Sequence, residues 1–191
     1  MKAIKWMFCL LVPLFLTGCL TVDTIKTTID IQDKEKPAIV TIQYGGFSSG
    51  EAKLEDVKKD FDYMIEEWKG DEALLDWAKE GMLVRDRQLM IENEKIQGVV
   101  TGLVQDLDDL YDFWEQNGER ILMVEFDEED FELTETNGLP IKTEKNRLIV
   151  WPSETKQLHW TMERISDSES IEKNRPIMMK MLKKYLKENP Q

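Results

Sequence analysis

The chain has 191 residues, with 25 basic and 38 acidic side chains and a formal net charge of −13 at neutral pH. Nucleic acid is bound through basic surfaces that release counterions, so this acidic balance argues against a nucleic-acid partner. Hydrophobic residues make up 41% of the chain and six residues are tryptophan, which excludes a disordered polypeptide and predicts a packed core.

The first nineteen residues, MKAIKWMFCLLVPLFLTGC, are organised as an export signal. Lys2 and Lys5 precede an apolar run from Trp6 to Leu16, and small residues follow that run. The run is too short to span a bilayer comfortably. It therefore predicts a secretory signal over residues 1–18, and not an element of the fold.

The apolar run ends in Leu16-Thr17-Gly18-Cys19, which resembles the lipobox of bacterial lipoprotein precursors. The resemblance implies that signal peptidase II cuts between Gly18 and Cys19. It also implies that diacylglycerol is attached to the Cys19 thiol and that the new amino group is acylated, so that the protein is held on a lipid bilayer. An ordinary signal peptide or an uncleaved anchor is the alternative, but neither explains a cysteine directly after Thr-Gly. In a Gram-negative host, Leu20 at the second mature position implies the outer membrane, facing the periplasm.

Removal of residues 1–18 leaves a mature chain over 19–191 with 23 basic and 38 acidic residues and a net charge of −15. This length suits a single domain with a sizeable core. Cys9 leaves with the signal and Cys19 carries lipid. No thiol then remains for a disulfide, for catalysis or for a cysteine-bound metal, and we expect no cofactor.

Alternating apolar and polar residues over 24–32 predict a half-buried strand that begins only about five residues after Cys19. Residues 38–44 are predicted to form a hairpin with it. Apolar side chains spaced by three and four predict a helix over 51–69. A second helix is predicted from Asp71, its N-cap, to Lys79, with Gly81 in the left-handed conformation that often follows a helix.

The remaining pattern is mostly strand. Residues 83–91 and 96–104 predict another hairpin, and Asp106 is predicted to cap a helix that runs to Asn117 and stops at Gly118. Asn137-Gly138 predicts a hairpin turn. Further strands are expected over 121–126, 131–136, 141–143, 147–151 and 157–165.

A C-terminal helix is predicted from Asn174 to Asn189, with Pro176 in its first turn. Because the strands come in hairpins and do not alternate with helices, we expect the α+β class. The predicted fold is one domain with a mainly antiparallel sheet of about seven to nine strands and three or four amphipathic helices.

The spacing of the candidate catalytic and metal-binding residues does not indicate a catalytic or metal site. His159 lies in a strand-like run that supplies neither a nucleophile nor an orienting carboxylate, so we expect a half-exposed strand histidine. Two acidic clusters, over 106–112 and 127–130, lack the calcium-loop pattern, and we interpret them as helix-capping and solvated residues. No catalytic or metal-binding residue is therefore assigned.

Two functions of different class remain. The first is a non-enzymatic envelope lipoprotein, close to the membrane, that binds a protein or an apolar ligand or has a structural role. The alternative is a hydrolase of envelope polymers that uses a pair of carboxylates. Four lysines of the C-terminal helix lie opposite its apolar stripe. They suit either membrane contact or an ordinary solvated face, and we favour the second because the stripe is what a core needs from this helix. These lysines are Lys180, Lys183, Lys184 and Lys187.

Overall fold

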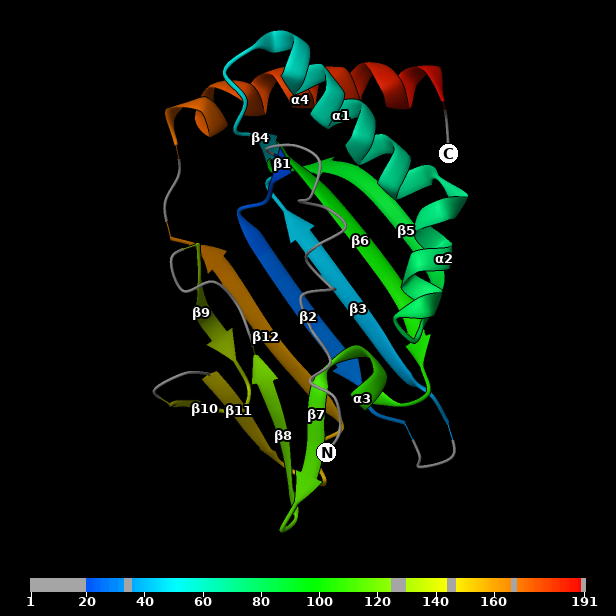
Figure 1. Cartoon of the computed structure of the whole chain (residues 1–191), viewed down its shortest axis with the longest axis vertical. Helices are drawn as coiled ribbons and strands as arrows, with labels where there is room; N and C mark the ends of the chain where they lie inside the picture. Colours follow the sequence, from blue (N-terminus) through cyan, green and yellow to red (C-terminus); the bar gives the residue numbers. More distant parts are fainter. Residues whose placement is uncertain (1–19, 33–35, 125–129, 144–146, 166–167, 190–191) are drawn as a thin grey trace.

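The computed structural model describes residues 20–32, 36–124, 130–143, 147–165 and 168–189 (Figure 1). These residues form twelve strands and four helices, and every strand pair in the three sheets is antiparallel. The predicted α+β class is thereby confirmed. The signal over 1–18 and Cys19 lie outside the described residues and stay predictions.

A six-stranded sheet forms the centre of the molecule, with the order β5-β6-β3-β2-β12-β9. Two predicted hairpins, β2 with β3 and β5 with β6, lie side by side in it. Ile25, Thr27 and Ile29 are buried on one face of β2 and Lys26 is exposed on the other, as the alternation predicts. The strands are β2 (Thr24–Asp30), β3 (Ala38–Gly45), β5 (Met82–Glu92), β6 (Lys95–Val104), β9 (Phe131–Thr136) and β12 (Gln157–Arg164).

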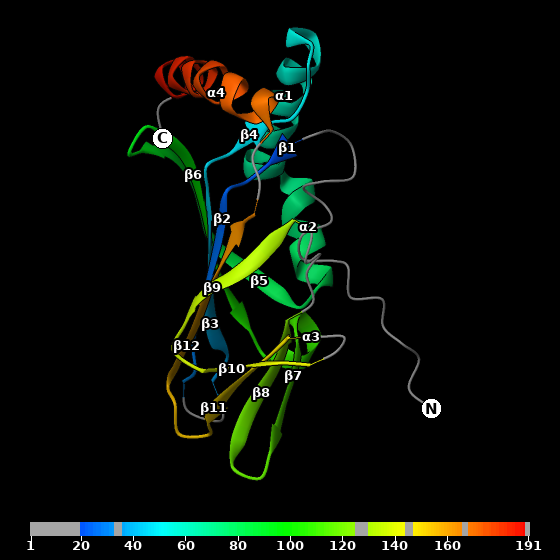
Figure 2. The ribbon, with the colours of Figure 1, turned by 90° about the vertical axis from the view of Figure 1, so that its left-hand side faces the viewer.

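A four-stranded sheet with the order β10-β11-β8-β7 lies beside the lower half of the six-stranded sheet (Figure 2). A short two-stranded sheet pairs β1 with β4 at the other end of the molecule (Figure 1). Its strands are β1 (Leu20–Thr21) and β4 (Ser48–Ser49), and those of the four-stranded sheet are β7 (Asp112–Gln116), β8 (Glu119–Val124), β10 (Leu139–Lys142) and β11 (Arg147–Pro152).

Helices cover one face and one end of the six-stranded sheet (Figures 1 and 2). Helices α1 (Leu54–Lys69) and α2 (Asp71–Lys79) pack on the β5 side, and α4 (Glu169–Glu188) crosses the end where β1 and β4 lie. Helix α3 (Leu107–Leu110) is a single turn. Gly70, and not the predicted Asp71, is the N-cap of α2. Gly81 has a φ of 90°, which agrees with the left-handed conformation predicted for it.

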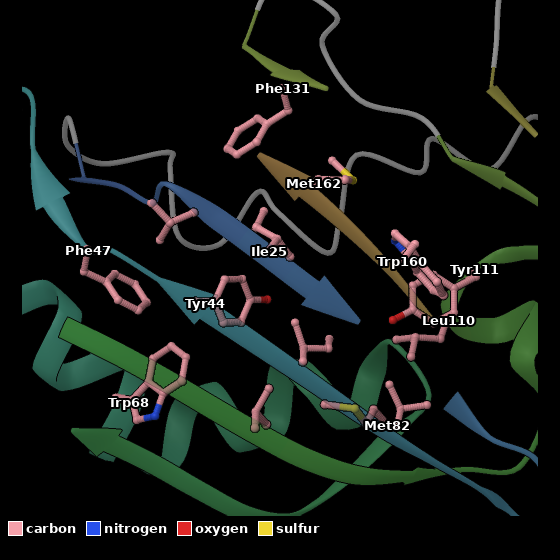
Figure 3. Packing of buried hydrophobic residues seen from close by; sticks show 14 of the residues in the cluster. Ile25, Tyr44, Phe47, Trp68, Met82, Leu110, Tyr111, Phe131, Trp160 and Met162 are labelled. Atoms are coloured by element: carbon pink, nitrogen blue, oxygen red, sulfur yellow. The ribbon is translucent and has the colours of Figure 1, made fainter. Parts of the chain in front are cut away.

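Two groups of aromatic rings fill the interior (Figure 3). Under α1, the Trp68 ring lies edge-on to Tyr44 and Phe47, with centroids 5.7 and 5.5 Å away. Between the two larger sheets, Trp160 packs edge-on against Tyr111 at 5.5 Å and lies 6.4 Å from Trp151. The second group joins the four-stranded sheet to the six-stranded one.

The helix predicted from Asp106 to Asn117 is wrong beyond its first turn. Asp106 does cap α3, since its Oδ1 accepts a hydrogen bond from the Asp108 N–H at 3.1 Å. The chain then turns extended at Tyr111 and enters β7. Asn117 and Gly118 have φ of 54° and 80°, which suits the two-residue turn that joins β7 to β8. The Asn-Gly pair is therefore a hairpin signal and not a helix stop.

The hairpin predicted at Asn137-Gly138 is also wrong, because β9 and β10 belong to different sheets. The Asn137 Oδ1 atom accepts hydrogen bonds from Trp151 Nε1 at 2.8 Å and from the His159 N–H at 3.0 Å. A Cβ atom at Gly138 would lie 2.6 Å from Ile149 Cγ2. Asn137 and Gly138 therefore fix the segment between β9 and β10 against both sheets.

The C-terminal helix begins five residues earlier than predicted. Ser168 caps it by accepting a hydrogen bond from the Ile171 N–H at 3.3 Å, so Pro176 lies inside the helix and not in its first turn. Asn174, the predicted start, is a buried residue whose side chain bonds to the β4 region. Ile171, Met178 and Leu182 are buried, which confirms the apolar stripe as a packing face.

Close packing between α1 and β6 generates a stability prediction. A methyl group at Gly98 would lie 2.5 Å from Cζ2 and 2.6 Å from Cη2 of Trp68. We expect Gly98→Ala to lower the free energy of unfolding by about 1–3 kcal/mol through overpacking. Chemical denaturation measures the loss. Phe lacks both clashing atoms, so the loss should shrink in a Trp68→Phe background, and an unchanged loss would contradict the contact.

Candidate functional site

The four-stranded sheet buries one face and exposes the other, although both faces are largely apolar. Its inward side chains include Leu122, Val124, Ile149 and Trp151, all buried in the core. The alternate residues of the same strands point away from the core. Seven of these outward side chains are apolar, and together we call them the apolar face: Trp114, Ile121, Met123, Leu139, Ile141, Leu148 and Val150.

Strand register places these residues in two continuous rows across all four strands. One row contains four apolar side chains and the second contains three followed by Asp112 on β7. Directly opposed residues lie about 4.5–5.5 Å apart, so the apolar side chains of each row form a contiguous strip. The first row is Leu139, Val150, Ile121 and Trp114, and the second is Ile141, Leu148, Met123 and Asp112.

The apolar face is accessible from solvent. Leu139 is 63% exposed, Ile141 is 41% exposed and Trp114 is 36% exposed, while the central residues are half-buried. The largest apolar patch on a soluble monomer is often functional, which makes this face the candidate interaction surface. Tryptophan and methionine are also among the residues enriched at the centres of interfaces.

A second notable region surrounds the first described residues, Leu20 to Asp23. Leu20 and Val22 are 1% and 0% exposed, and β1 pairs with β4 from Leu20 onward. The prediction of about five residues between Cys19 and the first strand is therefore wrong. Leu20, the residue that directly follows Cys19, is already part of the fold.

Polar contacts fix this segment on several sides. The Asp23 carboxylate is 2.8 Å from Arg175 Nη2 on α4 and 2.9 Å from Lys95 Nζ on β6, and the Asp23 side chain is 13% exposed. Arg164 Nε on β12 donates a hydrogen bond to the Val22 carbonyl at 3.0 Å. The start of the domain is thus bonded to helix α4 and to two strands of the six-stranded sheet.

A buried polar group joins β4 to both long helices. Ser49 Oγ donates to Asp60 Oδ2 on α1 at 2.5 Å, and Asn174 Nδ2 on α4 donates to the Ser49 carbonyl at 2.9 Å. Asp60 is 5% exposed. Burial raises the pKa of Asp60, and the charges of Glu51 and Asp56 act in the same direction, while the Ser49 hydrogen bond opposes them.

Of the catalytic and metal-binding candidates considered from the sequence, the structure describes His159, the first acidic cluster and Asp130 of the second. His159 is a half-exposed residue of β12, as predicted, with its side chain 25% exposed and Nε2 4.0 Å from Glu135 Oε1. Asp127 to Glu129 of the second acidic cluster lie outside the described residues. Among the residues described, no group of three or more His, Cys, Asp or Glu side chains is placed to hold a metal ion.

A hydrolase would need two carboxylates placed around one bond. In the part of the chain that the structure describes, Asp60 is the one buried carboxylate, and its hydrogen-bond partner is the Ser49 hydroxyl. This arrangement does not support the hypothesis of a carboxylate-dependent hydrolase.

Comparison with known proteins gives this chain no relatives: no protein-family model, no curated protein and no solved structure matches it. Within the described ranges, none of the helices is both long enough and apolar enough to span a bilayer.

Sequence reasoning missed the apolar face, although the sequence carries a signal for it. Residues 121–124 and 148–151 are uninterrupted apolar runs in strands, a pattern typical of strands buried on both faces. Here the second face is open to solvent. An unbroken apolar run in a small antiparallel sheet therefore indicated either a further layer of this fold or a partner.

The raised pKa of Asp60 predicts a specific pH dependence. The folded state holds the Asp60 proton more tightly than the unfolded state, so charging this carboxyl as pH rises above its ordinary range, near 4, lowers stability. We expect Asp60→Asn, which keeps the shape, to gain stability relative to the unsubstituted protein as pH rises from about 3 to about 7. Urea denaturation across that range measures the difference.

The matched control is Asp62→Asn, which removes the same charge from an exposed position of α1. The effect of burying the carboxyl is the difference between the pH profiles of the two variants. Equal pH profiles for the two variants would show that burial of Asp60 does not control its titration.

Proposed function

We propose that this chain is a lipid-anchored protein of the bacterial cell envelope that binds another envelope protein through the apolar face. The function is non-enzymatic. The observation that carries it is the contiguous apolar strip across β10, β11, β8 and β7, open to solvent at Leu139, Ile141 and Trp114. The lipobox resemblance of Leu16-Thr17-Gly18-Cys19 supports the anchor.

The size of the apolar face favours a modest contact. Four strands at about 4.8 Å spacing, each covered over about four residues at about 3.3 Å per residue, give a footprint of about 250 Å². A stable protein interface buries about 800 Å² on each partner. The contact is therefore transient. Confinement of both partners to one membrane raises their effective concentration, so that this weak contact can form.

Charge distinguishes the partner from a second copy of this chain. The predicted mature protein carries a net charge of −15, so two copies repel each other. Acidic side chains also border the apolar face at Asp112 and Glu119. A partner with an apolar surface bordered by basic residues matches this pattern in both respects.

The partner meets the face of the sheet and not its β10 edge. Strand β10 lies at one edge, and its four residues are all exposed. Pro140 has no N–H, and proline in a sheet places its nitrogen on the unpaired side of an edge strand. This edge therefore lacks a donor where an added strand would need one.

The anchor has a direct test. We expect Cys19→Ala to leave a soluble protein or an uncleaved precursor without the diacylglyceryl mass, whereas Cys9→Ala, inside the predicted signal, should be processed and anchored normally. Membrane fractionation and intact mass spectrometry measure both. A Cys19→Ala protein that is still cleaved and still sediments with membranes would contradict the proposed attachment.

The binding face is tested by photo-crosslinking in the native host, with the reactive residue placed at Leu139 or at Trp114. Both positions should give the same discrete product, and a control at Lys26 on the open face of the six-stranded sheet should not. Val150→Lys places a charge at the centre of the face and should reduce the product at least tenfold, because binding would bury an unpaired charge.

Thr41→Lys, on the open face of β3, is the matched variant and should leave the product unchanged. Circular dichroism checks that both lysine variants fold. A product with the mass of two copies of this chain, or equal products at the face and at Lys26, would overturn the proposed partner.

A further inference from the structure

We propose that the outward face of α4 lies on an anionic phospholipid surface, so that the domain stands on the membrane with α4 as its base. This inference rests on the proposed lipid attachment at Cys19 and names the membrane surface that the anchored domain contacts.

The first step is the position of α4 beside the start of the fold. Leu20 pairs with Ser49 in the β1·β4 sheet. Ser48 Oγ donates a hydrogen bond to the Ile171 carbonyl of α4 at 2.7 Å, and Asn174 Nδ2 donates to the Ser49 carbonyl. Helix α4 is therefore separated from the residue after Cys19 by a single strand. Figure 1 shows α4 at the same end of the molecule as β1.

The short tether then forces contact between this end and the lipid. Neighbouring strands lie about 4.8 Å apart and a helix with its side chains is about 10–12 Å across, so the outer side chains of α4 lie within about 20 Å of Leu20. One residue spans at most about 3.6 Å, which leaves Cys19 no room to hold the domain far from the head groups. The surface around Leu20 must face the bilayer.

The second step is the direction of the lysines on α4. Its buried residues Ile171, Asn174, Met178 and Leu182 define the inward face. At 100° per residue the lysines fall on the opposite face, and all of them are exposed. The packing of the apolar stripe and the contact of the lysines with a membrane are therefore compatible. The outward lysines are Lys173, Lys180, Lys183, Lys184 and Lys187.

The third step is charge. Helix α4 contains six basic and three acidic side chains, a net charge of +3, in a mature chain whose predicted net charge is −15. Basic side chains close to anionic head groups each strengthen binding roughly fivefold. The acidic remainder is repelled by the same surface, so the charge distribution favours the orientation with α4 toward the lipid.

The first turn of α1 adds an apolar side chain to this end. Leu54 is 53% exposed and lies next to the exposed Lys53, and α1 begins beside α4 in Figure 1. An exposed leucine at this end suits the boundary between head groups and acyl chains.

The test uses the lipidated protein purified from host membranes and reconstituted into vesicles of phosphatidylcholine, with or without about one-third phosphatidylglycerol. Pro176→Cys places a nitroxide label on the outward face of α4 and keeps all five lysines. Gln116→Cys places the label on β7, at the far end of the molecule (Figure 1). Accessibility of each label to a water-soluble nickel complex reports its distance from the lipid surface.

We expect the label at 176 to be at least threefold less accessible in the phosphatidylglycerol vesicles, with the protection lost at high salt, and the label at 116 to be unchanged. Replacement of Lys180, Lys183, Lys184 and Lys187 by Gln should abolish the protection. Replacement of four exposed lysines elsewhere by Gln should preserve it: Lys26, Lys69, Lys79 and Lys156.

Equal accessibility of the label at 176 in both kinds of vesicle, or protection at 116 instead, would overturn the inference. Intact mass separates this failure from failure of the anchor. A protein that carries the diacylglyceryl mass but shows no protection at 176 refutes the α4 contact alone, whereas absence of that mass refutes the proposed attachment.

Discussion

The burial of the residues that directly follow Cys19 constrains how the whole protein can be held. Leu20 and Val22 are core residues, and the Asp23 carboxylate bridges Arg175 on α4 and Lys95 on β6 in a largely buried setting. Loss of one partner from such a group leaves charge without compensation, so the segment cannot detach without cost. A lipid attached at Cys19 would therefore act on a rigid domain and not on a flexible stalk.

This rigidity separates two surfaces in space. Helix α4 and the β1·β4 sheet lie at one end of the molecule, and the four-stranded sheet lies toward the other (Figures 1 and 2). The first end is rich in lysine and the second is apolar with an acidic border. The proposed orientation places the lysines at the lipid and directs the apolar face away from it, where another envelope protein can reach it.

The elements predicted well are those whose local signal and tertiary role agree. The period-two alternation of β2 and the three-and-four spacing of α1 each describe a face that packs on one core. The helix predicted over 106–117 was wrong because Leu107, Leu110 and Tyr111 fit a helical stripe as well as a turn followed by a strand. The hairpin predicted at Asn137-Gly138 was wrong because a local turn signal does not indicate which sheet the next strand joins. The apolar face was missed because an apolar run in β8 or β11 does not say whether its second face is covered.

By itself, the sequence determined the α+β class, the main hairpins and the amphipathic helices, because these depend on side-chain periodicity along contiguous stretches. Tertiary structure alone decided that the strands divide into three sheets and that Leu20 is already paired and buried. It also decided that α4 lies beside that start and that one face of the four-stranded sheet is open. Each of these depends on contacts between residues more than twenty positions apart, such as Asp23 with Arg175, which no local pattern encodes.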